Sequence, residues 1–202
     1  MTTRREGILD AARGLIVRAG YASASMHAVA RAAGVTRPAL YAEFGDRDEL
    51  FAALLAREEE RVLAMAAAAT PELAEDADLS TIDVAVLGTD AVDIFLDQVL
   101  AAPETWQFVL MPGDGLPPAM HERVTQGRNA IRARSELLFA VIAALADREL
   151  DTEMMSHASI SVSETAARII VSEGGRDKHA ALSKTMRWMA RRMVAGTGIE
   201  KG

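Results

Sequence analysis

Residues 37–42 hold an arginine and a tyrosine four positions apart, a spacing that puts both side chains on one side of a helix. Leu40 and Phe44 have the same spacing, and as apolar residues they predict the buried side of that helix. The solvent side then carries Arg37, Ala39, Tyr41 and Ala42. A guanidinium can donate two hydrogen bonds to guanine, and an alanine methyl group can touch the methyl group of thymine. This compact face is therefore a candidate for insertion into a DNA major groove.

Two short helices joined by a turn are predicted to hold this face, within residues 25–44. Ser25 is a good N-cap for the first helix, and Thr36 is one for the second. Gly34 lies where the chain leaves the first helix, a position that favours a residue tolerating positive φ. Pro38 fits the first turn of the second helix, because no backbone donor is needed there. The stretch therefore has the pattern of a helix-turn-helix.

This pattern resembles the DNA-binding domain of TetR-family transcriptional regulators, and the resemblance covers about residues 5–55. The preceding stretch looks like the family's first helix, which Gly20 ends, and its expected inward residues are Ile8, Ala12, Leu15, Ile16 and Ala19. Asp46 and Glu49 look like a capping box at the start of the family's fourth helix. The residues that carry the resemblance in order are Ile8-Leu9, Gly20-Tyr21, Gly34-Val35-Thr36, Leu40-Tyr41, Phe44 and Glu49-Leu50.

The resemblance implies a set of DNA contacts. Ser25, Thr36 and Tyr41 would contact the DNA backbone through hydroxyls or helix N-terminal amides. His27 aligns with a position that reads a base in some relatives, and Arg47 stands where the family usually has a lysine facing a phosphate. We expect Arg37 to read a base edge and Ala39 to reach only a thymine methyl group. For each of these residues the alternative is an ordinary surface side chain.

Glu43 departs from the family's pattern, because many relatives carry a neutral or basic residue at this position near phosphate. Its carboxylate would be repelled unless it turns away, and Arg47 is the partner that the sequence suggests. Arg4 and Arg5 are expected to add mobile phosphate contacts. Residues 1–50 hold seven arginines against six acidic residues, whereas residues 51–202 hold 15 basic and 23 acidic ones. The acidity behind the net charge of −7 therefore lies outside the candidate DNA-binding domain.

The 202 residues suit an all-α protein, because half of them are apolar, alanine is abundant and strand-forming runs are scarce. Residues 1–50 would form a three-helix DNA-binding domain, and residues 51–202 a helical domain for effector binding and dimerisation. The later helices are expected at residues 47–69, 81–100, 103–111, 118–147, 151–172 and 176–195. The charged run at residues 57–61 is predicted to be a solvated face.

No run reaches about 18 apolar residues, so no membrane span is expected. The N-terminal stretch lacks the apolar core and cleavage site of a signal peptide. The chain has no cysteine, which excludes disulfides and thiolate sites. We therefore expect a cytoplasmic protein that does not associate with membranes.

In TetR-family proteins the second domain binds an inducing small molecule, and the resemblance implies the same here. The candidate pocket residues are Phe95, Trp106, Phe108, Met111, Met120, His121, Phe139 and Ile142. An apolar pocket with few polar groups fits an apolar or amphipathic effector. The alternative for any one of these residues is a place in the ordinary core.

The resemblance also places the last two long helices at a homodimer interface. Their candidate interface residues are Met155, Ile160, Ile169, Met186, Trp188, Met189 and Met193. Methionine-rich surfaces adapt to irregular partners. The alternative is that both helices bury against their own chain. A symmetric dimer would require a palindromic DNA operator.

Catalysis is not expected, and neither is a cofactor or a bound metal. Residues 121–125 lack the second histidine of a zinc metalloprotease helix, and the chain has neither a GxSxG elbow nor a Gly-rich phosphate loop after a strand. The resemblance implies a ligand-responsive transcriptional repressor. The alternative is a helical dimeric protein-interaction module that does not bind an operator.

Overall fold

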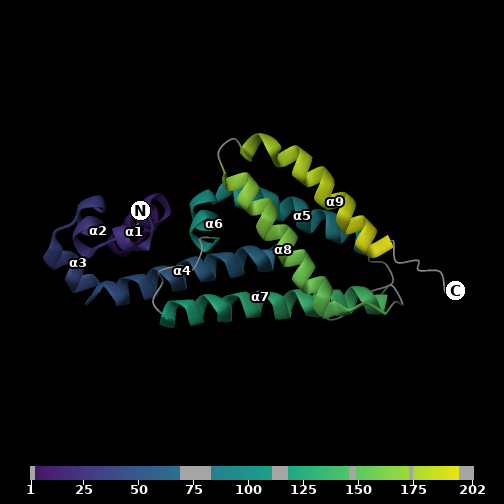
Figure 1. Ribbon diagram of the computed structural model, residues 1–202, viewed down its shortest axis with the longest axis horizontal. Helices are drawn as coiled ribbons and strands as arrows, with labels where there is room; N and C mark the ends of the chain where they lie inside the picture. The colour runs from purple at the N-terminus through teal and green to yellow at the C-terminus, as the bar shows by residue number, and fades with distance from the viewer. Residues whose placement is uncertain (1–2, 69–82, 111–117, 146–148, 173–174, 196–202) are drawn as a thin grey trace. The chain divides into compact units, whose positions relative to one another are not determined.

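The computed structural model describes residues 3–68, 83–110, 118–145, 149–172 and 175–195. All regular structure in these ranges is helical, which confirms the all-α prediction (Figure 1). The α-helices are α1 (Arg4–Ala19), α2 (Met26–Ala32), α3 (Arg37–Glu43), α4 (Arg47–Ala68), α5 (Val84–Ala101), α6 (Pro103–Val109), α7 (Pro118–Leu145), α8 (Thr152–Val171) and α9 (His179–Ala195). Within these ranges, the 3₁₀ turn η1 (Tyr21–Ser23) follows α1, and the 3₁₀ turn η3 (Gly175–Lys178) precedes α9.

The chain divides into two compact units. The first comprises Met1–Val62 and Glu104–Gly127, and the second comprises Leu63–Pro103 and Arg128–Gly202. Helices α4 and α7 therefore contribute residues to both units. The division predicted at residue 50 falls inside α4, and as a division between a DNA-binding part and an effector-binding part it stays a prediction.

The core of the first unit is built from α1, η1, α2, α3 and the start of α4. Its buried residues are Ile8, Leu9, Ala12, Ile16, Ala24, Met26, Val29, Ala30, Leu40, Phe44, Leu50, Phe51 and Leu54. Leu40 and Phe44 occupy the buried side of α3, as the sequence predicts. Ala19 was expected to face inward and is exposed instead, because it lies at the end of α1 where the chain turns away at Gly20.

The turn between α2 and α3 has the expected geometry. Gly34 has φ 66°, a left-handed conformation that side chains resist. The Val35 N–H donates to the carbonyl of Ala30 at 3.0 Å, and the Gly34 N–H donates to that of Arg31 at 3.3 Å. This is the hydrogen-bond pattern of a Schellman motif, which fixes the direction in which α3 begins.

The second unit packs α5 against both α8 and α9. Leu96 and Val99 of α5 are fully buried. Asp93 of α5 accepts hydrogen bonds from the Ser183 hydroxyl at 2.7 Å and from the Arg187 guanidinium at 2.6 Å, both on α9. Polar and apolar contacts together thus hold α5 and α9 side by side.

None of the described helices combines the length and the apolar character that crossing a bilayer requires.

Candidate nucleic-acid interface

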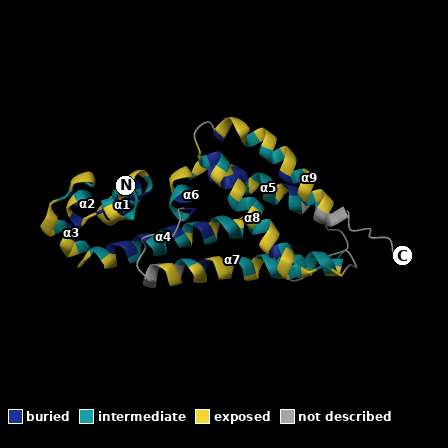
Figure 2. Cartoon of the chain, in the orientation of Figure 1, coloured by how far each residue is buried: buried dark blue, intermediate teal, exposed yellow. Residues whose placement is uncertain are grey.

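The outward face of α3 is the first component of the interface. Arg37, Pro38, Tyr41 and Ala42 are exposed, and Tyr41 keeps 44% of its surface accessible (Figure 2). Ala39 is half-buried beside them. Within the described ranges, Arg37 makes no hydrogen bond or ion pair, so its guanidinium is available to an outside partner. The face can therefore offer a planar cation and a phenol together.

The hydroxyls expected to meet the DNA backbone act as helix caps. The Ser25 hydroxyl accepts a hydrogen bond from the Ala28 N–H at 3.2 Å, and the Thr36 hydroxyl accepts one from the Ala39 N–H at 3.3 Å. Both residues are exposed, and each hydroxyl still has its own hydrogen to donate. His27 is exposed in the first turn of α2. The structure places all three on the surface, and their DNA contacts stay predictions.

Arg47, the expected phosphate contact, is directed into the domain. Its guanidinium donates to the Tyr21 carbonyl at 2.7 Å and lies over the Tyr21 ring, 4.4 Å from the ring centroid. The Phe51 ring centroid is 5.2 Å away. Burial raises the pKa of Tyr21 above its usual value, and the positive charge of Arg47 works in the opposite direction. Arg47 therefore joins η1 to the start of α4, and its contact with phosphate stays untested.

Two expectations at the edge of α3 are wrong. Glu43 was expected to turn toward Arg47, but its carboxylate lies 3.3 Å from the Arg5 guanidinium. Arg5, with Arg4, was expected to add mobile phosphate contacts, but it belongs to α1 and lies over the Phe44 ring, 4.3 Å from the centroid, so the expected mobility is wrong and the phosphate contact stays a prediction. The sequence pattern concealed this pairing, because the two residues are 38 positions apart.

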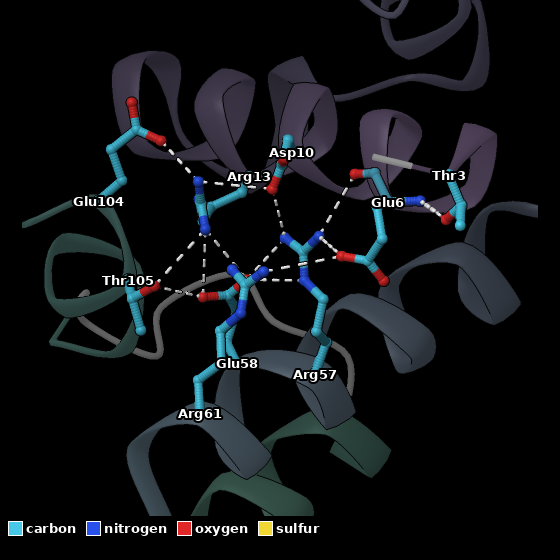
Figure 3. Close-up of polar contacts among 9 residues, drawn as sticks. All are labelled: Thr3, Glu6, Asp10, Arg13, Arg57, Glu58, Arg61, Glu104 and Thr105. Atoms are coloured by element: carbon cyan, nitrogen blue, oxygen red, sulfur yellow. Dashed lines mark hydrogen bonds and ion pairs between the residues drawn. The ribbon is translucent and has the colours of Figure 1, made fainter. Parts of the chain in front are cut away.

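The charged run at residues 57–61 is not the solvated face that the sequence predicts. Glu58 is fully buried, since guanidinium groups surround its carboxylate (Figure 3). Arg57, Arg13 and Arg61 lie 2.7, 3.3 and 3.0 Å from its oxygens. The Thr105 hydroxyl donates to the same carboxylate at 2.7 Å. Such a charge is stable in the interior only because it is paired and hydrogen-bonded.

This cluster around Glu58 joins three helices of the first unit (Figure 3). Arg13 of α1 also reaches Glu104 of α6 at 2.7 Å. Arg57 of α4 reaches Glu6 at 2.8 Å and Asp10 at 3.0 Å, both on α1.

Burial alone would lower the pKa of Arg57, but hydrogen bonds to Glu58 and Glu6 outweigh it, and the pKa is raised above its usual value. Arg57 is thus held in its charged form. The bonds around Glu58 therefore fasten α6 to α1 and α4.

The candidate effector residues lie in both units. Trp106 is buried on α6, and Phe108 of the same helix packs against the core of the first unit. His121 is exposed on α7. Phe95, Phe139 and Ile142 are half-buried in the second unit. Met111 and the Met120 side chain lie outside the described residues. Their common pocket stays a prediction.

The candidate dimer residues have unequal exposure. Trp188 and Met189 on α9 keep 59% and 37% of their surface accessible. Met155, Ile160 and Ile169 on α8 are half-buried. Met186 is buried within its own unit, so we do not carry it into the proposed interface. The Met193 side chain lies outside the described residues. The sequence missed Met154, a neighbour of Met155 that is 64% exposed.

Among the described residues, no group of three or more histidine, aspartate or glutamate side chains is placed to hold a metal ion.

Comparisons with known proteins point to one family. A family model described as bacterial regulatory proteins, tetR family, matches residues 8–54. An HTH-type transcriptional repressor of Mycobacterium tuberculosis is 38% identical over 66 residues, which cover 33% of this chain and 35% of that repressor. The chain thus spans about a third of the length of this curated relative.

Solved structures match over nearly the whole chain. A TetR-like transcriptional regulator from Rhodococcus sp. RHA1 has a TM-score of 0.75 and 24% identity, with 97% of this chain and 98% of that chain covered. The fatty acid degradation regulator FadR from Bacillus halodurans has a TM-score of 0.72 and 15% identity, with 98% of each chain covered. At these identities the likeness establishes the fold. Residues 8–54 thus match the tetR family of bacterial regulatory proteins, and the chain shares its fold with a TetR-like transcriptional regulator over nearly its whole length.

Proposed function

We propose that the protein is a transcriptional repressor that binds a palindromic DNA operator as a homodimer. The observation that carries this proposal is the outward face of α3, where Arg37 has no partner within the described ranges and Tyr41 is largely accessible. This face lies within residues 8–54, which match the model of the tetR family of bacterial regulatory proteins. Regulators of this kind act by binding, so we assign no catalytic residue. We place their action in the cytoplasm, where bacterial DNA lies.

Dimerisation would supply affinity that one domain lacks. Seven arginines and six acidic residues leave residues 1–50 only weakly basic, so a single domain gains little from phosphate attraction. Two copies of α3 about 34–36 Å apart would meet successive major grooves on one side of the duplex. The accessible apolar side chains of α9, Trp188 and Met189, are the surface that we propose for the contact between protomers.

Effector binding would act on DNA affinity through α6. We propose an apolar or amphipathic small molecule that contacts residues of α6, with Trp106 among the candidates. Thr105 and Glu104 of this helix are bonded to Glu58 and Arg13, so a displacement of α6 would strain the attachment of α1. By linkage, an effector that releases DNA must bind the DNA-free protein more tightly, with a coupling of about 1–3 kcal/mol.

The alternative, a protein-interaction module without operator binding, is suggested by the weak basic balance of residues 1–50 and by an unpaired Glu43 beside the recognition face. Its carboxylate is paired with Arg5, which removes most of that objection. We therefore favour operator binding.

The test is selection of duplexes from a random DNA pool by the purified protein. The proposal expects enrichment of one palindromic sequence and a retarded complex that contains two protomers. Failure to enrich any sequence would contradict it. Mass spectrometry of ligands that copurify with the protein would then identify the effector, and adding that compound should change the DNA dissociation constant.

A further inference from the structure

The two ends of α1 and α3 that face each other carry charges that their own helices disfavour. Glu43 is the last residue of α3, and this helix has no basic residue in its last turn. Helix C-termini carry partial negative charge, so an acid there is unfavourable. Arg5 lies in the first turn of α1, where partial positive charge makes a cation unfavourable. Each residue alone would destabilise its own helix. The contact between them gives each charge a partner of opposite sign.

The Arg5 guanidinium makes two hydrogen bonds with Glu43 and one ring contact with Phe44. Nη1 of Arg5 lies 3.3 Å from a carboxylate oxygen of Glu43 and 3.3 Å from the backbone carbonyl of the same residue. That carbonyl belongs to the last turn of α3, where helix carbonyls lack intrahelical partners. The guanidinium also lies over the ring of Phe44, which anchors the end of α3 in the core. Arg5 therefore acts as a C-terminal cap for α3, supplied by another helix.

The same contact controls the charge beside the outward face of α3. Glu43 is half-buried and follows the exposed pair Tyr41 and Ala42. An unpaired carboxylate there would repel the phosphates of a duplex that α3 enters. Pairing with Arg5 offsets this charge and holds the carboxylate toward α1.

We propose that Arg5 is a positioning residue for DNA binding, which acts through Glu43 and the end of α3 rather than by touching DNA. The inference rests on the proposed function, since it assigns a role within operator binding. A positioning role requires Glu43. A direct contact between Arg5 and a DNA phosphate would not depend on Glu43.

A double-mutant cycle separates the two roles. The dissociation constant of a duplex enriched from a random pool by the parent protein is measured for Arg5→Ala, Glu43→Gln and the double variant. We expect Arg5→Ala to weaken binding about fivefold, a typical effect of one helix-end charge. Glu43→Gln should change the parent less than about twofold, yet restore most of the affinity in the Arg5→Ala background, because the two side chains are coupled.

The opposite pattern overturns the inference. If Glu43→Gln tightens binding by the same factor in both backgrounds, Arg5 acts independently of Glu43. Arg4→Ala is the matched control, because it removes the same charge from an exposed neighbour with no contact among the described residues. An equal loss in Arg4→Ala would mean that charge alone matters.

Thermal unfolding of each variant checks that the fold is kept. Arg5→Gln, which keeps a donor on a long side chain, replaces Arg5→Ala in the cycle if the alanine variant does not fold. A parent protein that enriches no duplex would overturn the proposed function and this inference together. A parent that binds while Arg5→Ala binds equally well would overturn the inference alone.

Discussion

Arg37 and Arg47 show that arginines close in sequence can have opposite roles. Arg37 is exposed on α3 without a partner among the described residues, whereas Arg47 is used inside the domain by the Tyr21 carbonyl and ring. Arg5 and Arg13 are likewise engaged in ion pairs. Arg5, Arg13 and Arg47 therefore cannot be counted as DNA-facing charge. Sequence discrimination should depend on few side chains, and Arg37 is the foremost of them.

Arg37→Ala should relax base preference, because the guanidinium that can bond a base edge is lost. We expect a cost of about 1–3 kcal/mol on the selected duplex and little change on unrelated DNA. Competition binding with single-base variants of the selected duplex measures both. Arg18→Ala is the matched control, because Arg18 is exposed in the last turn of α1 and carries the same charge. Unchanged discrimination in Arg37→Ala would contradict this role.

Tyr41→Phe should weaken binding to all duplexes by the same factor. The phenol is expected to donate to a phosphate, and phosphate contacts carry no base information. Loss of one hydrogen bond to a charged phosphate predicts a cost of about 1.5–3 kcal/mol. Parallel titrations of the selected and a scrambled duplex provide the measurement. A loss confined to the selected duplex would show that Tyr41 reads a base instead.

The helices themselves were predictable because local chemistry determines their ends. Ser25 and Thr36 cap α2 and α3, and Gly34 adopts the positive φ that its place requires. Long-range pairing was not predictable in this way. Glu58 accepts hydrogen bonds from Arg13 and Thr105, which are 45 and 47 residues away in the sequence. A run of charged residues on one helix has the same sequence pattern whether solvent or another helix covers it. The local site was therefore predictable, and the contacts that attach it to α6 were not.

Substitution by alanine at two glycines in the first unit should change the free energy of unfolding in opposite directions. Gly34 has φ 66°, so Gly34→Ala should lower the free energy of unfolding by about 1–2 kcal/mol. Gly7 lies in α1 with no atom within 4 Å of the position of an added Cβ, so Gly7→Ala should raise that free energy by about 0.5–1 kcal/mol. Denaturant titration of both variants measures the difference. Equal effects would contradict the turn geometry.

Glu58→Ala should be strongly destabilising, because it leaves Arg13 and Arg57 without their buried counter-charge. Breaking a buried ion pair from one side costs about 3–5 kcal/mol. Glu60→Ala on the same helix is the control, since Glu60 is exposed and its loss should cost less than about 0.5 kcal/mol. The free energies of unfolding of both variants provide the comparison. A small effect at Glu58 would mean that the charge cluster contributes little to the fold.

At the scale of the whole molecule, the account depends on association of two protomers. Accessible Trp188 and Met189 make α9 the proposed contact, while buried Met186 belongs to the core of its own unit. Leu137 of α7 is 68% exposed and provides a matched apolar position on another helix. This leaves α9 as the place where a charge should prevent assembly.

Trp188→Asp should yield monomers, because a charge would be buried without a partner at the interface. Leu137→Asp should remain dimeric. Sedimentation velocity of the two variants and the parent distinguishes these states. Monomers from Leu137→Asp together with dimers from Trp188→Asp would place the interface elsewhere.

Footprinting of the parent protein on its selected duplex tests whether a symmetric dimer reads DNA through α3. The account predicts two protected half-sites related by a two-fold axis, with centres about one helical turn or a multiple apart. Arg37→Ala should weaken protection of both half-sites together. A single protected half-site, or no protection that depends on sequence, would contradict a symmetric dimer that reads DNA through α3.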